Sequence, residues 1–573
     1  MRAAGATRRG RATRPAGILA GLLLLVLPCV QAAPAPAVPA VPPAAAIASA
    51  HPLATQAGHD ILQAGGNAFD AAVAVGAMLA VVEPSGSGLG GGGFWLLHRA
   101  ADGREIMLDG RERAPLAARA DMYLDESGAI VPRRSLDGAL AAAIPGTPAA
   151  LVHLARRYGR LPLARTLAPA IRAARDGIRI DTHYLTLARF RLEALRRSPA
   201  AAAIFLDKDA VPGEEFVLRQ LDLARVLEAI AERGHDGFYA GPVAERLIEG
   251  VRAAGGIWTL RDLAEYRVVE REPVRGEYRG MRIVTAPPPS SGGIALVTML
   301  NILAGYPLEE QGELTRTHLI VEAMRRAYRD RAVYLGDPDF VDIPAAQLLH
   351  PFYAAGLRNA IRPDRATTSE SLPGVAADTA GNDTTHFSIL DRDGNYVAAT
   401  LSINLPFGAA FVPPGTGVLL NNEMDDFAAK PGVGNVYGLI GAQPNAIAAG
   451  KRPLSSMTPT FLDDGARVAI LGTPGGSRII SMMLLAALEF SRGGTPEQWV
   501  ARKRFHHQYL PDVVSHEAGA FSAEEGAALT ALGHRLEERT RPYGNMQAIL
   551  WDRARDRVLA ASDPRGGGAA VTQ

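Results

Sequence analysis

A change of pattern near residue 384 constrains the fold more than any other feature of this sequence. Before it, apolar residues recur at helical spacing over residues 67–82, 151–177, 221–233 and 317–335. After it, alternating runs such as "YVAATLSI", "RVAILGT" and "QAILWD" lie between turn signals, with one apolar helix at 479–490. We therefore expect a helix-rich front and a strand-rich back, and 573 residues suffice for a large core.

The strand-rich part opens with a predicted hairpin, "DTTHFSILDRDGNYVAAT", whose first strand covers 386–390 and whose second begins at Tyr396. A hairpin does not need two threonines after an acid, although most such pairs serve strand propensity alone. If the bond between Asp383 and Thr384 is broken, Thr384 gains a free α-amine with a pKa of about 8. That amine can act as the base for the hydroxyl of the same residue, so this pair is a candidate N-terminal nucleophile.

The first residues predict a leader. Five arginines precede residue 15, an apolar run covers 17–27, and "VQAA" follows, which is the order of a secretory signal peptide over 1–32. Without these five arginines, 55 of the 60 basic residues remain, fewer than the 59 acidic ones. This balance argues against a nucleic-acid partner. The apolar run is too short for a lasting membrane anchor. We expect a periplasmic or secreted protein.

Cleavage of this leader would remove Cys29, the sole cysteine, and with it any disulfide or thiolate chemistry. Pro28 disfavours a lipoprotein reading of Cys29, and Arg8-Arg9 is only a weak twin-arginine signal. A Pro/Ala-rich tether is predicted over 33–47, with folded sequence from near His51. A loop-rich stretch at 362–382 looks exposed and accessible to cleavage.

An ordered series of motifs extends along the chain. "EPSGSGLGGGGF" and "LDGRERAP" lie in the front, and the back holds "TTHFSILDRDGNYVAATLSIN", "LLNNEMDDF", "KRPLSSMTPT", "TPGGSRI" and "RFHHQYLPD". Together they closely resemble the γ-glutamyltranspeptidases over residues 51–565. The resemblance implies an α+β fold, the four-layer αββα sandwich of the N-terminal nucleophile hydrolases. It also implies self-cleavage into a large subunit, 48–383, and a small subunit, 384–573, which form the sandwich jointly.

The resemblance assigns the reacting groups. Thr384 matches the nucleophile, and Gly475 and Gly476 match the pair whose N–H groups face the oxyanion. Such donors typically supply about 3 kcal/mol of transition-state stabilisation. Ser402 stands where many relatives carry threonine, so the hydroxyl is kept, while the missing methyl could alter the rate of self-cleavage. Without the family, the glycines fit a tight turn equally well.

The resemblance also assigns the substrate's α-carboxylate to Arg111, Ser455 and Ser456. A guanidinium fork suits a planar carboxylate, and hydroxyls add donors. On its own, "GRERAP" would fit a surface arginine and "PLSSM" a loop or a helix cap.

Asn404, Glu423 and Asp426 match the group that receives the α-ammonium. A γ-glutamyl group ends in a zwitterion, so both sets are needed. A glutaryl or cephalosporin acylase of the same architecture is the nearest alternative, but its substrate lacks this amine. A non-catalytic protein that binds γ-glutamyl compounds is a second alternative.

Residues 430–445 resemble the lid loop of many bacterial members, with Tyr437 at the position that closes on Asn404, although an ordinary surface loop remains an alternative. The implied substrates are glutathione and related amides, with water, an amino acid or a dipeptide as acceptor. We expect neither a cofactor nor a metal.

Three other signals carry less weight. "GSGLGG" at 86–91 fits a dinucleotide motif, but a helix precedes it and a strand follows, the reverse of the required order. His506 and His507 lack a set of further metal ligands, and Ser290-Ser291 lacks the spacing of a serine-hydrolase elbow. We predict structural roles for all three.

Overall fold

Two β-sheets form the centre of the structure, a computed structural model that describes residues 41–373, 384–430 and 432–573. Within these residues the first sheet has seven strands in the order β18-β1-β9-β10-β2-β3-β6, and the second has six in the order β17-β16-β12-β11-β8-β7. The first sheet comprises β1 (Ala46–Ser49), β2 (Gly92–Arg99), β3 (Arg104–Gly110), β6 (Val269–Arg271), β9 (Thr385–Leu390), β10 (Tyr396–Ser402) and β18 (Ala569–Thr572). The second comprises β7 (Val274–Tyr278), β8 (Met281–Thr285), β11 (Thr460–Asp463), β12 (Arg467–Gly472), β16 (Gln547–Asp552) and β17 (Arg557–Ser562).

Alternation of side chains along β2 explains why the first sheet is covered on both faces. Trp95 and Leu97 belong to the apolar core beneath the front helices, whereas Phe94 and Leu96 belong to a second core that includes residues of the other sheet. Successive residues of a strand point to opposite faces, so one strand contributes to both cores. The two sheets therefore pack face to face.

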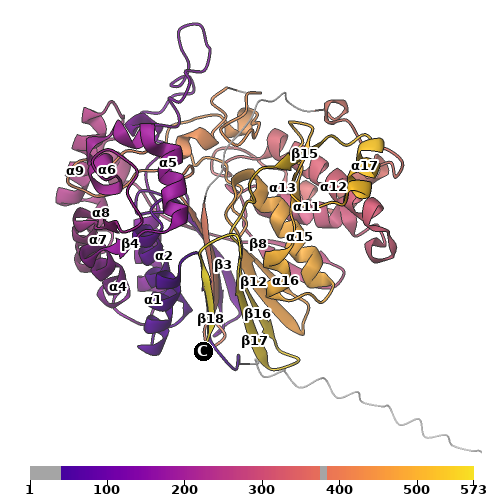
Figure 1. Ribbon diagram of the computed structural model, residues 1–573, viewed down its shortest axis with the longest axis horizontal. Coiled ribbons are helices and arrows are strands. Elements are labelled where there is room, and N and C mark those ends of the chain that lie inside the picture. Colours follow the sequence, from indigo (N-terminus) through magenta and orange to yellow (C-terminus); the bar gives the residue numbers. More distant parts are fainter. Residues whose placement is uncertain (1–40, 374–383, 431) are drawn as a thin grey trace, which may run out of the picture. The chain divides into compact units, whose positions relative to one another are not determined.

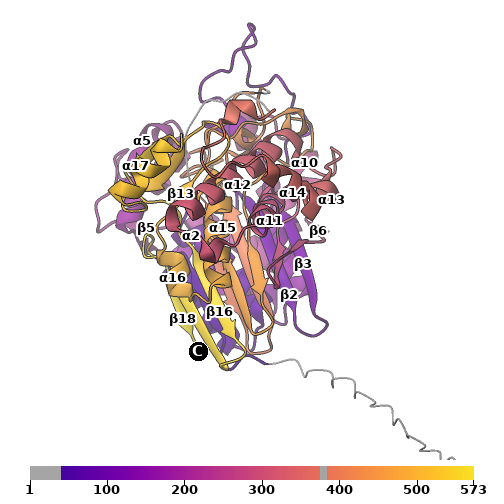
Figure 2. The same ribbon diagram turned by 90° about the vertical axis from the view of Figure 1, so that its right-hand side faces the viewer.

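Helices cover the outer face of each sheet (Figures 1 and 2). On the first sheet lie α1 (Pro52–Gln63), α2 (Ala68–Val82) and α3 (Thr147–Arg157). Outside them are α4 (Leu163–Asp176) and α7 (Leu221–Arg233), with α5 (Thr182–Arg196) and α9 (Gly241–Ala253) nearby. On the second sheet lie α11 (Gly292–Leu303) and α15 (Ile479–Ser491), and α12 (Glu313–Tyr334) packs on α11. The result is a four-layer αββα sandwich, as predicted.

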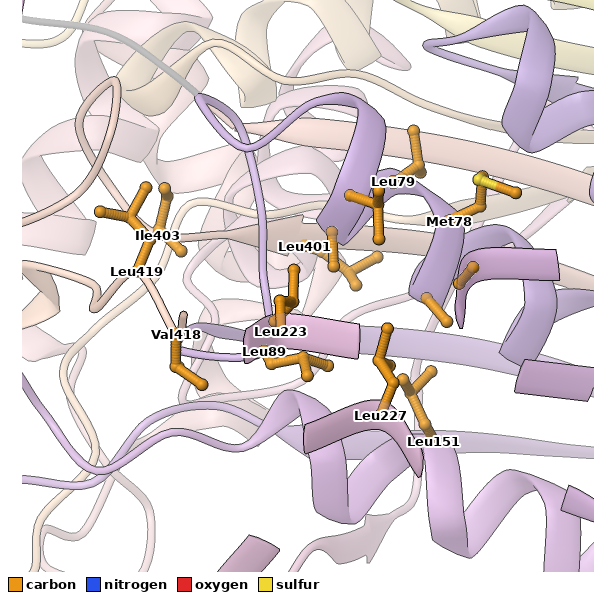
Figure 3. Close-up of a cluster of buried hydrophobic side chains, with 14 of the residues drawn as sticks. Met78, Leu79, Leu89, Leu151, Leu223, Leu227, Leu401, Ile403, Val418 and Leu419 are labelled. Atoms are coloured by element: carbon orange, nitrogen blue, oxygen red, sulfur yellow. The ribbon is translucent and has the colours of Figure 1, made fainter. Parts of the chain in front are cut away.

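Figure 3 shows how the first core joins the front helices to the hairpin. Buried side chains of α2, α3 and α7 meet β10 and the loop after it. A Cβ on Gly76 would lie 3.3 Å from Leu151 and 3.8 Å from Leu401, so α2 packs closely against both side chains. The labelled members of this cluster are Met78, Leu79, Leu89, Leu151, Leu223, Leu227, Leu401, Ile403, Val418 and Leu419.

The predicted hairpin is present, with β9 and β10 in antiparallel register and β9 between β1 and β10. Thr385 pairs with Leu401, so the next pair along the register brings Thr384 beside Ser402. Each sheet contains strands from both sides of residue 384. A cut before Thr384 would therefore leave two pieces that share one fold.

Several predicted boundaries need correction. The tether predicted over 33–47 ends too late, because Ala46 and Ile47 are buried in β1 and pair with β9 and β18. Four small or apolar residues are too few to reveal a strand by pattern. The helix predicted over 151–177 is two helices, α3 and α4, since "GRLP" at 159–162 interrupts it. The described part of the 362–382 loop is not uniformly exposed, because Ser369 is fully buried.

The leader and most of the tether, residues 1–40, lie outside the described residues, as does Asp383. Within the described residues, the helices are all too short or too polar to cross a membrane.

Candidate active site

One small pocket collects most of the predicted site residues. It is lined by Arg111, Thr384, Ser402, Asn404, Asp426, Tyr437, Leu439, Ser455, Ser456, Met457, Gly476 and Ile479. Two further predicted residues, Glu423 and Gly475, lie directly beside members of this lining, and Asp383 of the predicted cleavage site lies outside the described residues. Free space in the pocket amounts to about 20 Å³, room for one water molecule. A substrate must therefore displace groups that now fill the pocket.

Thr384 stands at the head of β9 and is 8% exposed. Its neighbour Ser402 accepts a hydrogen bond at Oγ from the backbone N–H of Asn404, at 2.7 Å. Because that oxygen already accepts, the hydroxyl proton of Ser402 is left to donate within the pocket. The structure thus supports Ser402 as a donor beside the candidate nucleophile.

Arg111 follows β3 and is buried among acids. Its Nη2 donates to Asp426 Oδ2 at 2.5 Å, and its Nη1 lies 2.7 Å from Glu423 Oε2 and 3.3 Å from Glu112 Oε2. Nε donates to the carbonyl of Pro453 at 3.1 Å. These carboxylates hold the pKa of Arg111 above its ordinary value, although burial acts in the opposite direction. The guanidinium is therefore a permanent cation at the end of the pocket.

Glu423 and Glu112 are buried carboxyls with raised pKa values. Burial raises the pKa of Glu423 well above its ordinary range, Arg111 opposes the shift, and Glu112 adds to it. Burial likewise raises the pKa of Glu112 to about 7. Neither Glu423 oxygen accepts a hydrogen bond from a described residue, because its contact with Arg111 is an ion pair without hydrogen-bond geometry. A bound cation would supply the missing donors.

Asn404 adopts the left-handed backbone conformation, with φ of 73°, which asparagine tolerates better than most residues. Its Nδ2 donates to the carbonyl of Asn422 at 3.0 Å. That bond fixes the amide so that Oδ1 is an acceptor, and none of the described side chains donates to it. Asn404, Asp426 and Glu423 thus form a set of oxygens beside Arg111.

Gly475 and Gly476 lie between β12 and α15, with φ of 140° and 56°. The backbone N–H groups of both glycines make no hydrogen bond to another described backbone group, and they precede the N-terminus of α15. Helix N-termini favour negative charge. The pair is therefore suited to an oxyanion, and its catalytic role stays a prediction.

Gly476→Ala should lower kcat by about 10²-fold. A Cβ at this position would lie 2.5 Å from the ring of Tyr437, and an alanine at φ of 56° is strained. Both effects would turn the N–H away from the oxyanion. Steady-state kinetics on a γ-glutamyl amide measure the loss.

Gly493→Ala is the matched control. Gly493 follows the other end of α15, it also has a positive φ, of 88°, and a Cβ added there would meet open space. This variant should lose stability but keep kcat. A Gly476→Ala protein with wild-type kcat would contradict the oxyanion role.

Ser455 and Ser456 lie on a segment held by the Ser290-Ser291 loop. The hydroxyl and the N–H of Ser291 both donate to the carbonyl of Ser455, at 2.7 and 2.8 Å. The N–H of Met457 donates to Ser455 Oγ at 3.0 Å, which leaves the Ser455 proton free to donate elsewhere. The Ser290-Ser291 pair therefore has the structural role that we predicted.

The segment predicted as a lid lies across the pocket. Tyr437 is 7% exposed, and its hydroxyl donates to the carbonyl of Asn404 at 2.9 Å. Asn435 Nδ2 donates to Asp426 Oδ1 at 3.1 Å, and the N–H of Val436 donates to Asp425 Oδ2 at 2.9 Å. The segment is thus tied to the same acidic turn, η4 (Glu423–Asp426), that faces Arg111.

Asp425, which holds this segment, gives a pH prediction. Burial raises its pKa from 3.8 to about 7. The folded state therefore binds this proton more tightly than the unfolded state, so the stabilisation is complete below about pH 4 and is lost as pH rises through 7. Between about pH 5 and pH 8, wild type should lose about 3 kcal/mol relative to Asp425→Asn.

Melting temperatures of both proteins across this pH range measure the difference. Asp464→Asn, which removes a carboxylate from an exposed position, controls for the effect of pH on the rest of the protein. A pH-independent difference between wild type and Asp425→Asn would contradict the prediction.

The other two demoted motifs also have structural roles. A Cβ on Gly90 would lie 2.0 Å from the carbonyl oxygen of Leu419, so the glycine run serves close backbone packing. His506 contacts Ser481, whereas His507 contacts Asp512, so the two rings point to different neighbours.

One cluster of possible metal ligands, His318, Glu322 and His534, was found among the described residues. Its carboxylate is already occupied by Arg326, which donates at 2.6 Å, and by Thr367. The two imidazoles hydrogen-bond each other at 2.8 Å. These contacts describe a buried polar network rather than an open cation site.

Sequence reasoning missed two charged residues at the pocket. Glu112 follows Arg111 in "GRERAP" and completes its acidic surroundings. Arg331 on α12 donates to Ser456. The motif offered a signal for Glu112, whereas Arg331 is one of several arginines on a helix and carried none.

A threonine at the head of a central strand, in a pocket of an αββα sandwich, defines the class of N-terminal nucleophile hydrolases. The family model described as Gamma-glutamyltranspeptidase matches residues 54–573. The chain belongs to this family, and it is therefore an enzyme that transfers γ-glutamyl groups.

Individual relatives and solved structures are similar to most of this chain or to a large part of it. A glutathione hydrolase proenzyme of Pseudomonas sp. (strain A14) is 43% identical over 91% of this chain and 92% of its own length. The cephalosporin acylase structure from Bacillus halodurans is 29% identical and covers 95% of this chain and 99% of its own, with a TM-score of 0.80. A γ-glutamyltranspeptidase structure from Helicobacter pylori is 41% identical and covers 57% of this chain and 94% of its own, with a TM-score of 0.56.

Proposed function

We propose that this chain is a self-processing glutathione hydrolase and γ-glutamyltransferase with Thr384 as its nucleophile. One observation carries the proposal: a hydroxyl, a buried guanidinium and a half-buried carboxylate, from Thr384, Arg111 and Asp426, line one pocket. A γ-glutamyl group carries an acyl carbon at one end and a zwitterion at the other. The three groups match these parts.

The substrate's zwitterion would enter between Arg111 and Asp426. Without substrate these two side chains contact each other at 2.5 Å and leave little free space. An α-carboxylate on Arg111 and an α-ammonium on Asp426 would replace that one ion pair by two. Glu423 and Asn404 would supply the remaining acceptors for the ammonium.

Catalysis would follow from the position of Thr384. Its Oγ would attack the γ-carbonyl carbon while its α-amine takes the proton, and the oxyanion would rest on the N–H groups of Gly475 and Gly476. Collapse would expel the amine of cysteinylglycine, which takes that proton, and leave a γ-glutamyl ester on Thr384. Water or an acceptor amine would then release the acyl group.

Maturation would use the same atom. Before the cut, Thr384 Oγ would attack the carbonyl of Asp383, and the peptide nitrogen would leave as the new α-amine. Water would then hydrolyse the ester. The products are a large subunit ending at Asp383 and a small subunit beginning at Thr384, and we expect the leader to direct both to the periplasm or outside the cell.

An acylase activity on glutaryl side chains is the alternative, given the structural likeness to a cephalosporin acylase. The γ-glutamyl and glutaryl substrates both carry a carboxylate, but only the γ-glutamyl substrate carries an α-amine. We expect the side-chain oxygens of Asn404, Glu423 and Asp426 to accept hydrogen bonds from an ammonium, which favours the γ-glutamyl substrate. Each charge-assisted hydrogen bond contributes about 1.5–3 kcal/mol.

Release of a chromogenic amine from a γ-glutamyl anilide and from the matching glutaryl anilide tests this choice. We expect a preference of about 10²-fold or more for the γ-glutamyl donor. Equal rates, or a preference for the glutaryl donor, would reassign the enzyme as an acylase.

A further inference from the structure

Arg331 differs from the other buried arginines of the described chain. Six of these have a carboxylate within 4 Å: Arg111, Arg191, Arg325, Arg326, Arg452 and Arg504. Arg331 is 4% exposed and has no carboxylate within that distance among the described residues. Buried charges are normally paired, so this guanidinium calls for an anion that the described residues do not supply.

The surroundings of Arg331 explain how it is tolerated. It lies in the last turn of α12, where the helix dipole favours a cation. Burial lowers its pKa to about 10, while Asp426 and Tyr328 oppose the shift. Arg331 therefore stays charged near neutral pH. Asp426, the acid that stabilises this charge, also lines the pocket.

Arg331 reaches the pocket through Ser456. Its Nε donates to Ser291 Oγ at 3.0 Å, and its Nη2 donates to Ser456 Oγ at 3.4 Å. A hydroxyl oxygen that accepts from a cation is left with its own proton to donate. Ser456 lines the pocket, so that proton is available to an anion bound there.

Ser455 is arranged in the same way, because its Oγ accepts from the N–H of Met457. Both serines therefore offer donors, but only Ser456 is polarised by a buried positive charge. Ser456 thus connects the guanidinium of Arg331 to the pocket in which the α-carboxylate would bind. Arg111 would hold that carboxylate from its other side.

We propose that Arg331 is a positioning residue which, through Ser456, makes the pocket selective for donors that end in a carboxylate anion. This inference rests on the proposed γ-glutamyl function. The α-carboxylate supplies the negative charge that the described residues do not place beside Arg331. Arg331 itself touches no substrate atom.

Two matched donors test the proposal: a γ-glutamyl anilide with a free α-carboxylate, and the same anilide as its α-carboxamide. In Arg331→Met, kcat/KM for the carboxylate donor should fall about 10- to 100-fold, mainly through KM. The carboxamide donor should change less than about threefold, because it brings no charge. Arg331→Lys should restore part of the preference.

Arg316→Met is the matched control, since Arg316 lies on the same helix and pairs with Glu313 away from the pocket. It should leave both donors unchanged. Equal losses for the two donors in Arg331→Met would show a merely structural role and overturn the proposal. No loss for either donor would overturn it as well.

A cycle with Ser456→Ala tests whether Arg331 acts through that hydroxyl. The double variant Arg331→Lys/Ser456→Ala should lose little more than Ser456→Ala alone, whereas additive losses would contradict the route through Ser456. If Arg331→Met fails to fold, Arg331→Lys still decides the question, and failure of both to fold would overturn the proposal. Failure of the proposed function is distinguishable, because wild type would then release amine from neither donor.

Discussion

Thr384→Val is expected to remain one uncut chain and to lose at least about 10⁴-fold in turnover of a γ-glutamyl anilide. Valine keeps the branched shape of threonine and removes only Oγ, so the fold should survive. Without that oxygen neither the chain nor the substrate can be attacked. A denaturing gel follows the cut, and amine release follows the activity.

Thr385→Val is the matched control for this result. Its hydroxyl donates to Glu83 rather than lining the pocket, so its loss should cost about 1–3 kcal/mol of stability. The chain should still be cut and active. Cleavage or turnover in Thr384→Val at the rate of Thr385→Val would remove Thr384 from the mechanism.

Arg111→Lys is expected to lower kcat/KM by about 10²-fold or more while the chain still matures. Lysine keeps the positive charge, but it cannot contact Asp426, Glu423 and the Pro453 carbonyl from one planar group. The substrate's carboxylate would lose its bidentate partner. The loss should therefore appear mainly in KM.

Arg113→Lys is the control from the same "GRERAP" motif. Its guanidinium donates to the carbonyls of Gly450 and Glu265, away from the pocket, so kinetics should change little. If Arg111→Lys behaved like Arg113→Lys, Arg111 would be a structural arginine, as the motif alone would suggest.

Much of the fold could be predicted from periodicity. The helix at 221–233 and the hairpin from residue 384 are local patterns, and the structure has both. The strand β1 could not be predicted, because "AIAS" gains its meaning only from pairing with β9 and β18, which are distant in sequence. Long-range pairing leaves no trace in so short a segment.

The site could be predicted only through the family resemblance. Nothing local indicates that Arg111 meets the turn at Glu423–Asp426, since the contact depends on how the layers pack. Arg331 shows the same limit more sharply. It follows Arg325, Arg326 and Arg329 on one helix. Only the packed structure distinguishes Arg331, which has no carboxylate partner among the described residues, from these three paired arginines.

N-terminal sequencing and mass measurement of the purified, active protein test the central claim most directly. We predict two chains, the shorter beginning with Thr384 and carrying a free α-amine, and activity that rises in step with their appearance in fresh precursor. A single intact chain that works at the full rate, or a shorter chain that begins at another residue, would contradict the account.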